Sequence, residues 1–205
     1  MSRVLPALAL GLALVGCSRS GDTAPPKPPA DAKQTGNGSD GGTTATDLDP
    51  AEAAAQDKAI AFVTRMKGKV RRGDGNAVTE VDLSFKPVTD AELKELAGLK
   101  RLAVLNLAYT QVTDAGVAEL VPLKSLTTLS LRGTKVTGAG FRALAPLKSL
   151  TSMDLRATHV SDAGLREIGA LKSLTSLDLI AIMGTVEGVN SLQRALPKCK
   201  IEKIQ

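Results

Sequence analysis

Hydrophobic residues recur along most of the chain at a fixed spacing. Over residues 78–197 the pattern Leu-x-x-Leu-x-Leu returns every 24 residues, opening at Leu102, Leu126, Leu150 and Leu174 after a degenerate first copy. The last two apolar positions of each triplet alternate with other residues, which predicts a short strand with one buried face. A Thr or Ser then precedes a short amphipathic stretch, which predicts a capped helical segment.

Five such units predict an α/β fold in which stacking buries the flat sides that a single unit leaves bare. The pattern resembles the leucine-rich repeat, which implies a right-handed solenoid with short parallel strands on the concave face and short helices on the convex face. One departure is systematic, because Thr110, Thr134 and Thr158 stand where that family usually has Asn. Their hydroxyl groups can still bond to the backbone. The style of the repeats also resembles those of many bacterial lipoproteins and of the cysteine-containing and GALA-type subfamilies.

A different pattern occupies the amino terminus. Arg3 is followed by an apolar run of 12 residues, which is too short to span a bilayer and suits the core of an export signal. The run ends in Leu14, Val15, Gly16 and Cys17, which resembles the lipobox of bacterial lipoproteins. The resemblance implies cleavage before Cys17, a lipid on its thiol and several acyl chains as a membrane anchor. An ordinary secretory signal with a chance cysteine is the alternative. Ser18, rather than Asp, follows the cysteine, and by resemblance to enterobacterial sorting this favours the outer membrane.

The remaining segments complete the predicted domain organisation. After the signal peptide (1–16), residues 17–49 are rich in Pro, Gly, Ser and Thr and predict a disordered tether. Residues 50–77 predict a helix and a hairpin that cap the first repeat, since the open end of a solenoid needs cover. The repeats themselves span 78–197, and residues 198–205 predict a capping strand with lysines that discourage edge pairing.

The composition argues against several classes of function. The net charge is +5 and only four residues are aromatic, so the basic face with interleaved aromatic rings that usually accompanies nucleic-acid binding is missing. His159 is the only histidine, and neither it nor Cys199 has a partner at a metal-ligand or catalytic spacing. We therefore expect no enzymatic activity, no metal, no cofactor, no small-molecule substrate and no nucleic-acid partner.

The predicted concave face is the usual binding surface of this architecture. Its outward residues follow from the register of the repeat, and those expected to contact a partner are Asp82, Phe85, Asn106, Tyr109, Arg132, Asp154, Arg156 and Asp178. We expect Phe85 and Tyr109 to stack side by side on the first two strands, as a binding anchor for a protein or peptide. A solvated face without an evolved partner is the alternative.

Three functions are compatible with these features. The first is a lipid-anchored leucine-rich-repeat module of the bacterial cell envelope that binds a protein or peptide. The second is a structural or adhesive envelope component that binds an anionic polymer through a row of lysines at Lys100, Lys124, Lys148 and Lys172, although lysines at helix carboxyl ends are also favoured for structural reasons. The third is an intracellular adaptor resembling the repeats of F-box proteins, against which the export signal argues.

Overall fold

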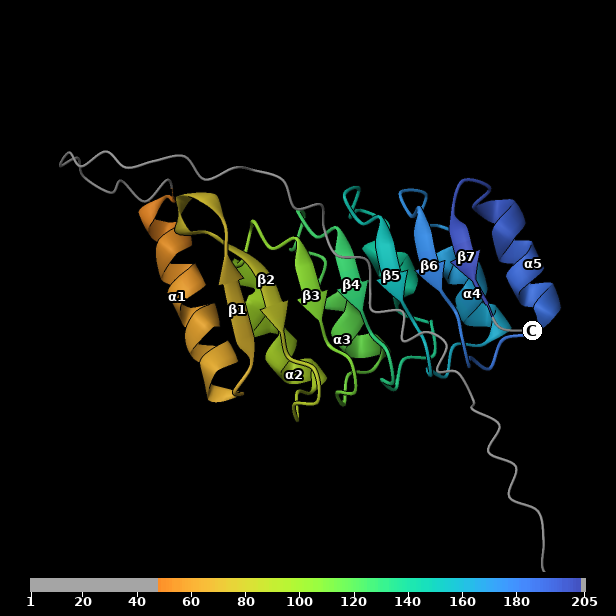
Figure 1. The fold of residues 1–205 in the computed structure, drawn as a ribbon, viewed down its shortest axis with the longest axis horizontal. Coiled ribbons are helices and arrows are strands. Elements are labelled where there is room, and N and C mark those ends of the chain that lie inside the picture. Colours follow the sequence, from red (N-terminus) through yellow and green to blue (C-terminus); the bar gives the residue numbers. More distant parts are fainter. Residues whose placement is uncertain (1–47, 204–205) are drawn as a thin grey trace, which may run out of the picture. The chain divides into compact units, whose positions relative to one another are not determined.

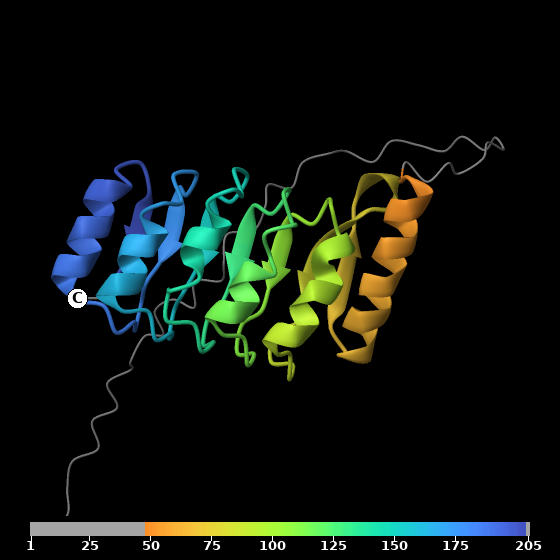
Figure 2. The ribbon, with the colours of Figure 1, turned by 180° about the vertical axis from the view of Figure 1, so that it is seen from behind.

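The computed structural model describes residues 48–203, which lie within one unit, Thr43–Gln205. The predicted export signal, Cys17 and the predicted tether up to residue 47 fall outside the described residues, as do the last two residues of the chain. Figure 1 shows the unit with its strands in front, and Figure 2 shows the helices on the opposite side.

Seven short strands form one sheet in chain order. They are β1 (Lys69–Arg72), β2 (Val78–Asp82), β3 (Val104–Asn106), β4 (Thr128–Ser130), β5 (Ser152–Asp154), β6 (Ser176–Asp178) and β7 (Lys200–Glu202). β1 runs antiparallel to β2, whereas every later pair is parallel. In every parallel pair a residue is matched with the residue 24 positions later, as Leu105 is with Leu129. Equivalent positions of successive repeats therefore lie side by side.

Helical segments cover the other face of the sheet (Figure 2). They are α1 (Pro50–Arg65), α2 (Asp90–Leu93), η2 (Lys94–Gly98), α3 (Asp114–Ala118), η3 (Phe141–Leu144), α4 (Asp162–Ile168) and α5 (Val186–Ala195), and a 3-10 turn, η1 (Asp74–Asn76), closes the β1–β2 hairpin. Strands on one side and short helices on the other confirm the predicted α/β solenoid.

The leucines of the repeat fill one continuous core between the sheet and the helices. In the second unit Leu102, Leu105 and Leu107 are all fully buried, and the equivalent residues of the following units are buried as well. Thr110 is also buried, and its Oγ1 donates to the carbonyl oxygen of Leu107 at 2.7 Å. Thr134 and Thr158 make the same bond within their own repeats. Each of these threonine hydroxyl groups therefore bonds within its own repeat, and other residues link neighbouring repeats.

One such link comes from carboxylates at the helix starts, which were not predicted. Asp90 accepts hydrogen bonds from the backbone N–H of Thr113 at 2.7 Å and from its Oγ1 at 2.6 Å. The same contact joins Asp114 to Thr137 and Asp162 to Thr185. Each carboxylate thereby occupies the orphan donors at the start of the next helical segment.

This row of contacts is interrupted once, where Gly138 takes the place of the aspartate. Gly138 has φ +104°, and a Cβ built on it would lie 2.3 Å from the Cα of Gly164. Here Ser161 N donates to the carbonyl oxygen of Thr137 at 3.3 Å instead. Two glycine backbones in close approach replace the side-chain contact, and the helical segment of this repeat begins only at Phe141.

The first end of the solenoid is closed by α1 and the β1–β2 hairpin. Asp49 caps α1 through a hydrogen bond from Ala51 N at 3.2 Å. Gln56 is buried, and its Oε1 accepts from Val78 N at 2.7 Å while its Nε2 donates to the carbonyl oxygen of Asn76 at 3.1 Å. One side chain therefore fastens the cap to the first repeat strand.

Over residues 48–203, no helix has the length and apolar character needed to cross a membrane.

Candidate functional site

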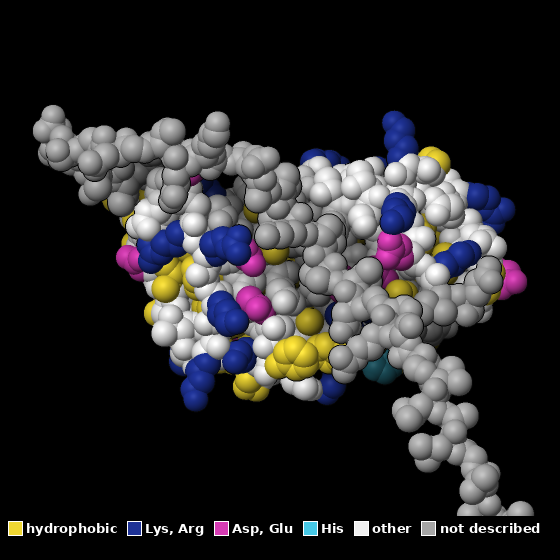
Figure 3. Space-filling view, in the orientation of Figure 1, with side chains coloured by type: hydrophobic (Ala, Val, Ile, Leu, Met, Phe, Trp, Pro, Cys, Tyr) yellow, Lys and Arg dark blue, Asp and Glu magenta, His cyan; other side chains and the backbone are white. Residues whose placement is uncertain are grey.

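The face of the sheet that the helices leave open is the predicted concave face, and we call it the strand face. Figure 3 views it directly and shows positive and negative side chains intermixed with hydrophobic ones. Side chains alternate along each strand, so two positions of every strand point to this face. One of these positions holds the predicted residues Asp82, Asn106, Asp154 and Asp178, and the sheet register aligns them in one row with Ser130.

The other outward position was missed, although the same period of two predicts it. It is the row Glu80, Val104, Thr128, Ser152, Ser176 and Lys200, again aligned by the register. Most of this row is small or uncharged. It supplies area to the strand face without adding strong charge beyond its two ends.

Some side chains of the row that contains Asp82 accept hydrogen bonds from nearby backbone N–H groups. Asp82 Oδ1 accepts a hydrogen bond from Ser84 N at 2.9 Å, and Asn106 Oδ1 accepts one from Ala108 N at 3.1 Å. Asp154 Oδ1 accepts from Arg156 N at 3.0 Å in the same manner. A short polar side chain at this position therefore fixes the turn that follows the strand, and only its remaining acceptor capacity is available to a partner.

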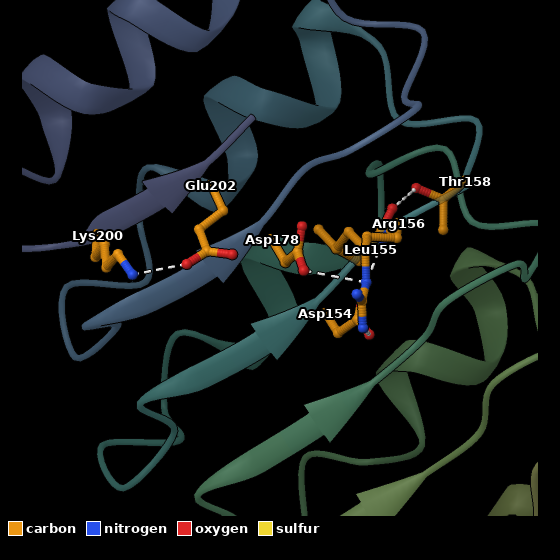
Figure 4. A network of polar contacts seen from close by, with 7 residues as sticks. All are labelled: Asp154, Leu155, Arg156, Thr158, Asp178, Lys200 and Glu202. Carbon is orange, nitrogen blue, oxygen red and sulfur yellow. Dashed lines mark hydrogen bonds and ion pairs between the residues drawn. The ribbon is translucent and has the colours of Figure 1, made fainter. Parts of the chain in front are cut away.

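At β5–β7 the charged residues pair with one another, and we call this region the ion-paired end (Figure 4). Arg156 Nη2 lies 2.7 Å from Asp154 Oδ2, and Arg156 Nε lies 3.0 Å from Asp178 Oδ2. Lys200 Nζ lies 2.7 Å from Glu202 Oε1 on the last strand. The Arg156 side chain is 32% exposed and the two aspartates are less so, which makes the two Arg156 contacts stronger than an exposed surface pair such as Lys200–Glu202.

The electrostatics of this end favour the charged arginine. The hydrogen bond to Asp154 raises the pKa of the Arg156 guanidinium against the opposing effect of burial, and the charges of Asp154 and Asp178 add to the rise. Burial raises the pKa of Asp178 above its ordinary value; Arg156 opposes this rise and Asp154 reinforces it. The arginine is therefore held by two carboxylates, one of which is itself costly to ionise.

At β2–β4 the face is different, and we call Phe85, Tyr109 and Arg132 the aromatic end. The rings of Phe85 and Tyr109 stack with centroids 4.7 Å apart and planes 15° apart, as the sequence predicts. Phe85 is 73% exposed and Tyr109 is 39% exposed. The guanidinium carbon of Arg132 lies 5.6 Å from the centroid of the Tyr109 ring, which is within the range of a cation–π contact.

The position of the two rings corrects the prediction in one respect. Phe85 and Tyr109 do not lie on the strands, because β2 ends at Asp82 and β3 ends at Asn106. They occupy the turn three residues later, with φ +59° and +57°. The same turn of the later repeats holds Gly133, Ala157 and Ala181, also at positive φ. A non-glycine residue there costs about 1–2 kcal/mol, so large exposed rings at this position do not serve backbone stability.

Other candidate chemistry is weaker. His159 is exposed, and burial raises the pKa of the Cys199 thiol, which makes it a poor nucleophile. No group of three or more His, Cys, Asp or Glu residues that could hold a metal ion is found within residues 48–203. Two lysines of the predicted row bind nearby carbonyl oxygens, Lys148 that of Ala145 at 2.9 Å and Lys172 that of Ala195 at 3.1 Å. These bonds favour the structural interpretation of the row.

Comparison with known proteins agrees with this architecture. A family pattern described as "Leucine Rich repeat" matches residues 123–145. A leucine-rich-repeat protein of Leptospira interrogans aligns at 25% identity and a TM-score of 0.46 over 60% of this chain, which spans 36% of that protein's chain. The leucine-rich-repeat ectodomain of the receptor kinase SOBIR1 from Arabidopsis thaliana aligns at 17% identity and a TM-score of 0.50, over 74% of this chain and 92% of that one. No curated protein matches the sequence. The matched repeat, the 24-residue register of the sheet and the helices behind it give this chain the fold of a leucine-rich-repeat protein.

Proposed function

We propose that this protein is a lipid-anchored binding module of the bacterial cell envelope, and that it binds a protein or peptide on its strand face. Solenoids of this type present an extended surface built from equivalent positions of successive repeats, and they commonly act as protein-interaction modules. The parallel register of β2–β7 builds such a surface here.

The exposed stack of Phe85 and Tyr109 is the observation that carries the proposed binding. Aromatic side chains are enriched among the residues that dominate the energy of protein interfaces. The two rings are stacked 4.7 Å apart, yet Phe85 remains 73% exposed. A partner that covers them gains apolar burial without having to order the rings first.

The proposed anchor rests on the sequence alone. Leu14, Val15, Gly16 and Cys17 follow an apolar run of signal-peptide length. A thioether-linked lipid on Cys17 together with acylation of the new amino terminus gives the two or more acyl chains that stable anchoring needs. Residues 18–47 then act as a spacer between the membrane, for which we favour the outer membrane, and the solenoid. The predicted tether is two residues shorter than expected, because Leu48 is buried and Asp49 caps α1.

The binding function is tested by photo-crosslinking the full-length protein in native envelope fractions. A specific partner is expected to crosslink to the wild-type protein and to a Met183→Ala control, which removes another exposed apolar side chain. The same partner is expected to be lost when Phe85 and Tyr109 are both changed to Ala. Retention of the partner in the double variant would exclude the strand-face stack as the binding surface.

The anchor is tested separately by intact-mass analysis of the native protein. The wild type is expected in the membrane fraction, cut before Cys17 and heavier by a lipid, while Cys17→Ser is expected to be soluble and unlipidated. A soluble, unmodified wild-type protein would exclude the proposed anchor and leave the binding test unaffected.

A further inference from the structure

We propose that the aromatic end recognises an extended peptide segment in which an aromatic side chain and a carboxylate lie within three residues of each other. The aromatic side chain stacks on Phe85, and the carboxylate binds Arg132. This inference rests on the proposed function, because it specifies the partner of the strand face.

The aromatic pair is held in place by the fold before any partner arrives. Tyr109 is covered by Phe85 on one side, and it leans over Gly133, where a Cβ would lie 2.4 Å from Tyr109 Cδ1. The strand before β2 is β1, which joins in an antiparallel hairpin and brings no equivalent turn. The described chain therefore places no further ring on the outer face of Phe85, which is 73% exposed.

Arg132 lacks the partners that its equivalent in the next repeat possesses. Arg156 is held by the aspartate two residues before it and by the aspartate of the next strand. The residues at the corresponding positions around Arg132 are Ser130, which carries no charge, and Asp154, which is already bonded to Arg156. Within residues 48–203, Arg132 forms no ion pair with an acidic residue, and its buried Nε has no hydrogen-bond acceptor.

Arg132 is only half-buried, and the buried atom of its guanidinium without an acceptor is Nε alone. A carboxylate supplied from outside can therefore pair with the Nη groups, and carboxylates are the acceptors that match the planar guanidinium best. The same guanidinium contacts the Tyr109 ring at 5.6 Å, so it is oriented toward the aromatic pair. A ligand that satisfies Arg132 is thereby brought beside Phe85 and Tyr109.

The spacing between the two features suits a short stretch of extended chain. The centroid distances of 4.7 Å and 5.6 Å put the Phe85 ring and the Arg132 guanidinium within about 10 Å of each other. An extended chain advances about 3.3 Å per residue, so up to three residues cover this distance. Flat rings prefer offset or edge-on contact with another ring, which makes an aromatic residue the natural neighbour for the open face of Phe85.

The test uses Tyr109 as a built-in reporter. It is the only tyrosine of the chain, which also lacks tryptophan, so the intrinsic emission of the full-length protein comes from this site. The probe is acetyl-Gly-Phe-Ser-Glu-Gly-amide, which adds no tyrosine or tryptophan. We expect a saturable change in emission, and an approximately tenfold weaker affinity when the Glu of the peptide is replaced by Gln or its Phe by Ala, as for loss of one charge-assisted contact.

Protein variants assign the two contacts. Arg132→Gln is expected to weaken binding about tenfold and to bind the Glu and Gln peptides equally, because the carboxylate then has no guanidinium to pair with. Phe85→Ala is expected to abolish the preference for Phe over Ala in the peptide. Arg142→Gln removes the same charge from η3 on the helix side and should bind as the wild type does. Unchanged urea midpoints identify the variants that remain folded.

Three outcomes would overturn the inference. The first is the absence of a saturable response to the Phe–Glu peptide, or equal responses to all three peptides. The second is an equal response to polygalacturonate, which would assign the face to an anionic polymer. The third is tighter peptide binding after residues 25–29 of the predicted tether are replaced by glycines, together with altered emission of the peptide-free protein. This result would show that the tether of the same chain occupies the face.

Failure of this inference is distinguishable from failure of the proposed function. If a crosslinked envelope partner depends on Phe85 and Tyr109 but is bound equally well by Arg132→Gln, the strand face binds a protein through different chemistry. If neither the double aromatic variant nor Arg132→Gln affects the partner, the proposed function itself fails.

Discussion

The two ends of the strand face carry arginines at equivalent positions but surround them differently. Arg156 contacts Asp154 of its own repeat and Asp178 of the next repeat. Arg132, one repeat earlier, has Ser130 in place of the first aspartate and contacts the Tyr109 ring instead. The repeat fixes where the arginine lies, while the residue two positions earlier, Asp154 or Ser130, decides whether it forms an ion pair within its own repeat.

The largest expected difference between the two ends concerns stability. Arg156→Ala leaves two carboxylates close together without their cation, and we expect the free energy of unfolding to fall by about 2 kcal/mol. Arg132→Ala removes a cation–π contact and should cost less than about 1 kcal/mol. Urea denaturation of both variants checks the comparison, and equal losses would show that the two arginines have the same structural role.

The aromatic end is also expected to depend on one glycine. Gly133→Ala places a Cβ at φ +64° against the Tyr109 ring, and we expect a loss of about 1–2 kcal/mol in stability together with altered Tyr109 emission. Ala157→Gly is the matched control, since the same turn at φ +53° holds no ring. Relief of the positive φ is partly offset by the greater freedom of glycine in the unfolded chain, so its stability should rise by up to about 1 kcal/mol, and its Tyr109 emission should not change. An unchanged emission of Gly133→Ala would show that the ring does not rest on this glycine.

The sequence predicts the fold well because the repeat is a pattern of burial. Leucines at a fixed period of 24 residues determine which positions are buried, and the sheet register follows from stacking them. The stack of Phe85 and Tyr109 was predictable for the same reason, since equivalent positions of parallel neighbours meet. The period therefore predicts burial and register, which are the two properties that stacking fixes.

Features that the period of the leucines does not encode were harder to predict. The turn position of Phe85 and Tyr109 depends on where hydrogen bonding ends the strand, and the alternation pattern does not report this. The unpaired state of Arg132 depends on which arginine Asp154 contacts. The carboxylate links from Asp90, Asp114 and Asp162 did have a signal, a Thr-Asp or Ser-Asp pair at each helix start, and its interruption at Gly138 was visible as well.

A single substitution can convert the aromatic end toward the ion-paired one. Ser130→Asp supplies the carboxylate that Arg156 has in Asp154, and pairing it with Arg132 is expected to raise stability by about 0.5 kcal/mol. The same change should weaken binding of the Phe–Glu peptide, because the guanidinium is then occupied. Ser152→Asp adds the same charge to the neighbouring outward row and serves as the control. Stronger peptide binding by Ser130→Asp would contradict the role assigned to Arg132.

The smallest expected effect is a difference in the sign of pH dependence between two aspartates. Burial raises the pKa of Asp178, so its ionised form costs stability above the folded-state pKa, and this cost disappears as the pH falls through that value. For Asp114, burial alone would raise the pKa, but hydrogen bonds from Thr137, Gly138 and Gly140 outweigh it and lower the pKa below the ordinary 3.8. The stability that ionised Asp114 contributes is therefore full above pH 3.8 and is lost as the pH falls through its folded-state pKa.

Urea denaturation between about pH 2 and pH 7 compares the two aspartates. Wild type should gain stability relative to Asp178→Asn on acidification toward about pH 4, and it should lose stability relative to Asp114→Asn below that. The same sign for both variants would mean that burial does not govern Asp178, and that Arg156 holds it as firmly as the backbone of the next repeat holds Asp114.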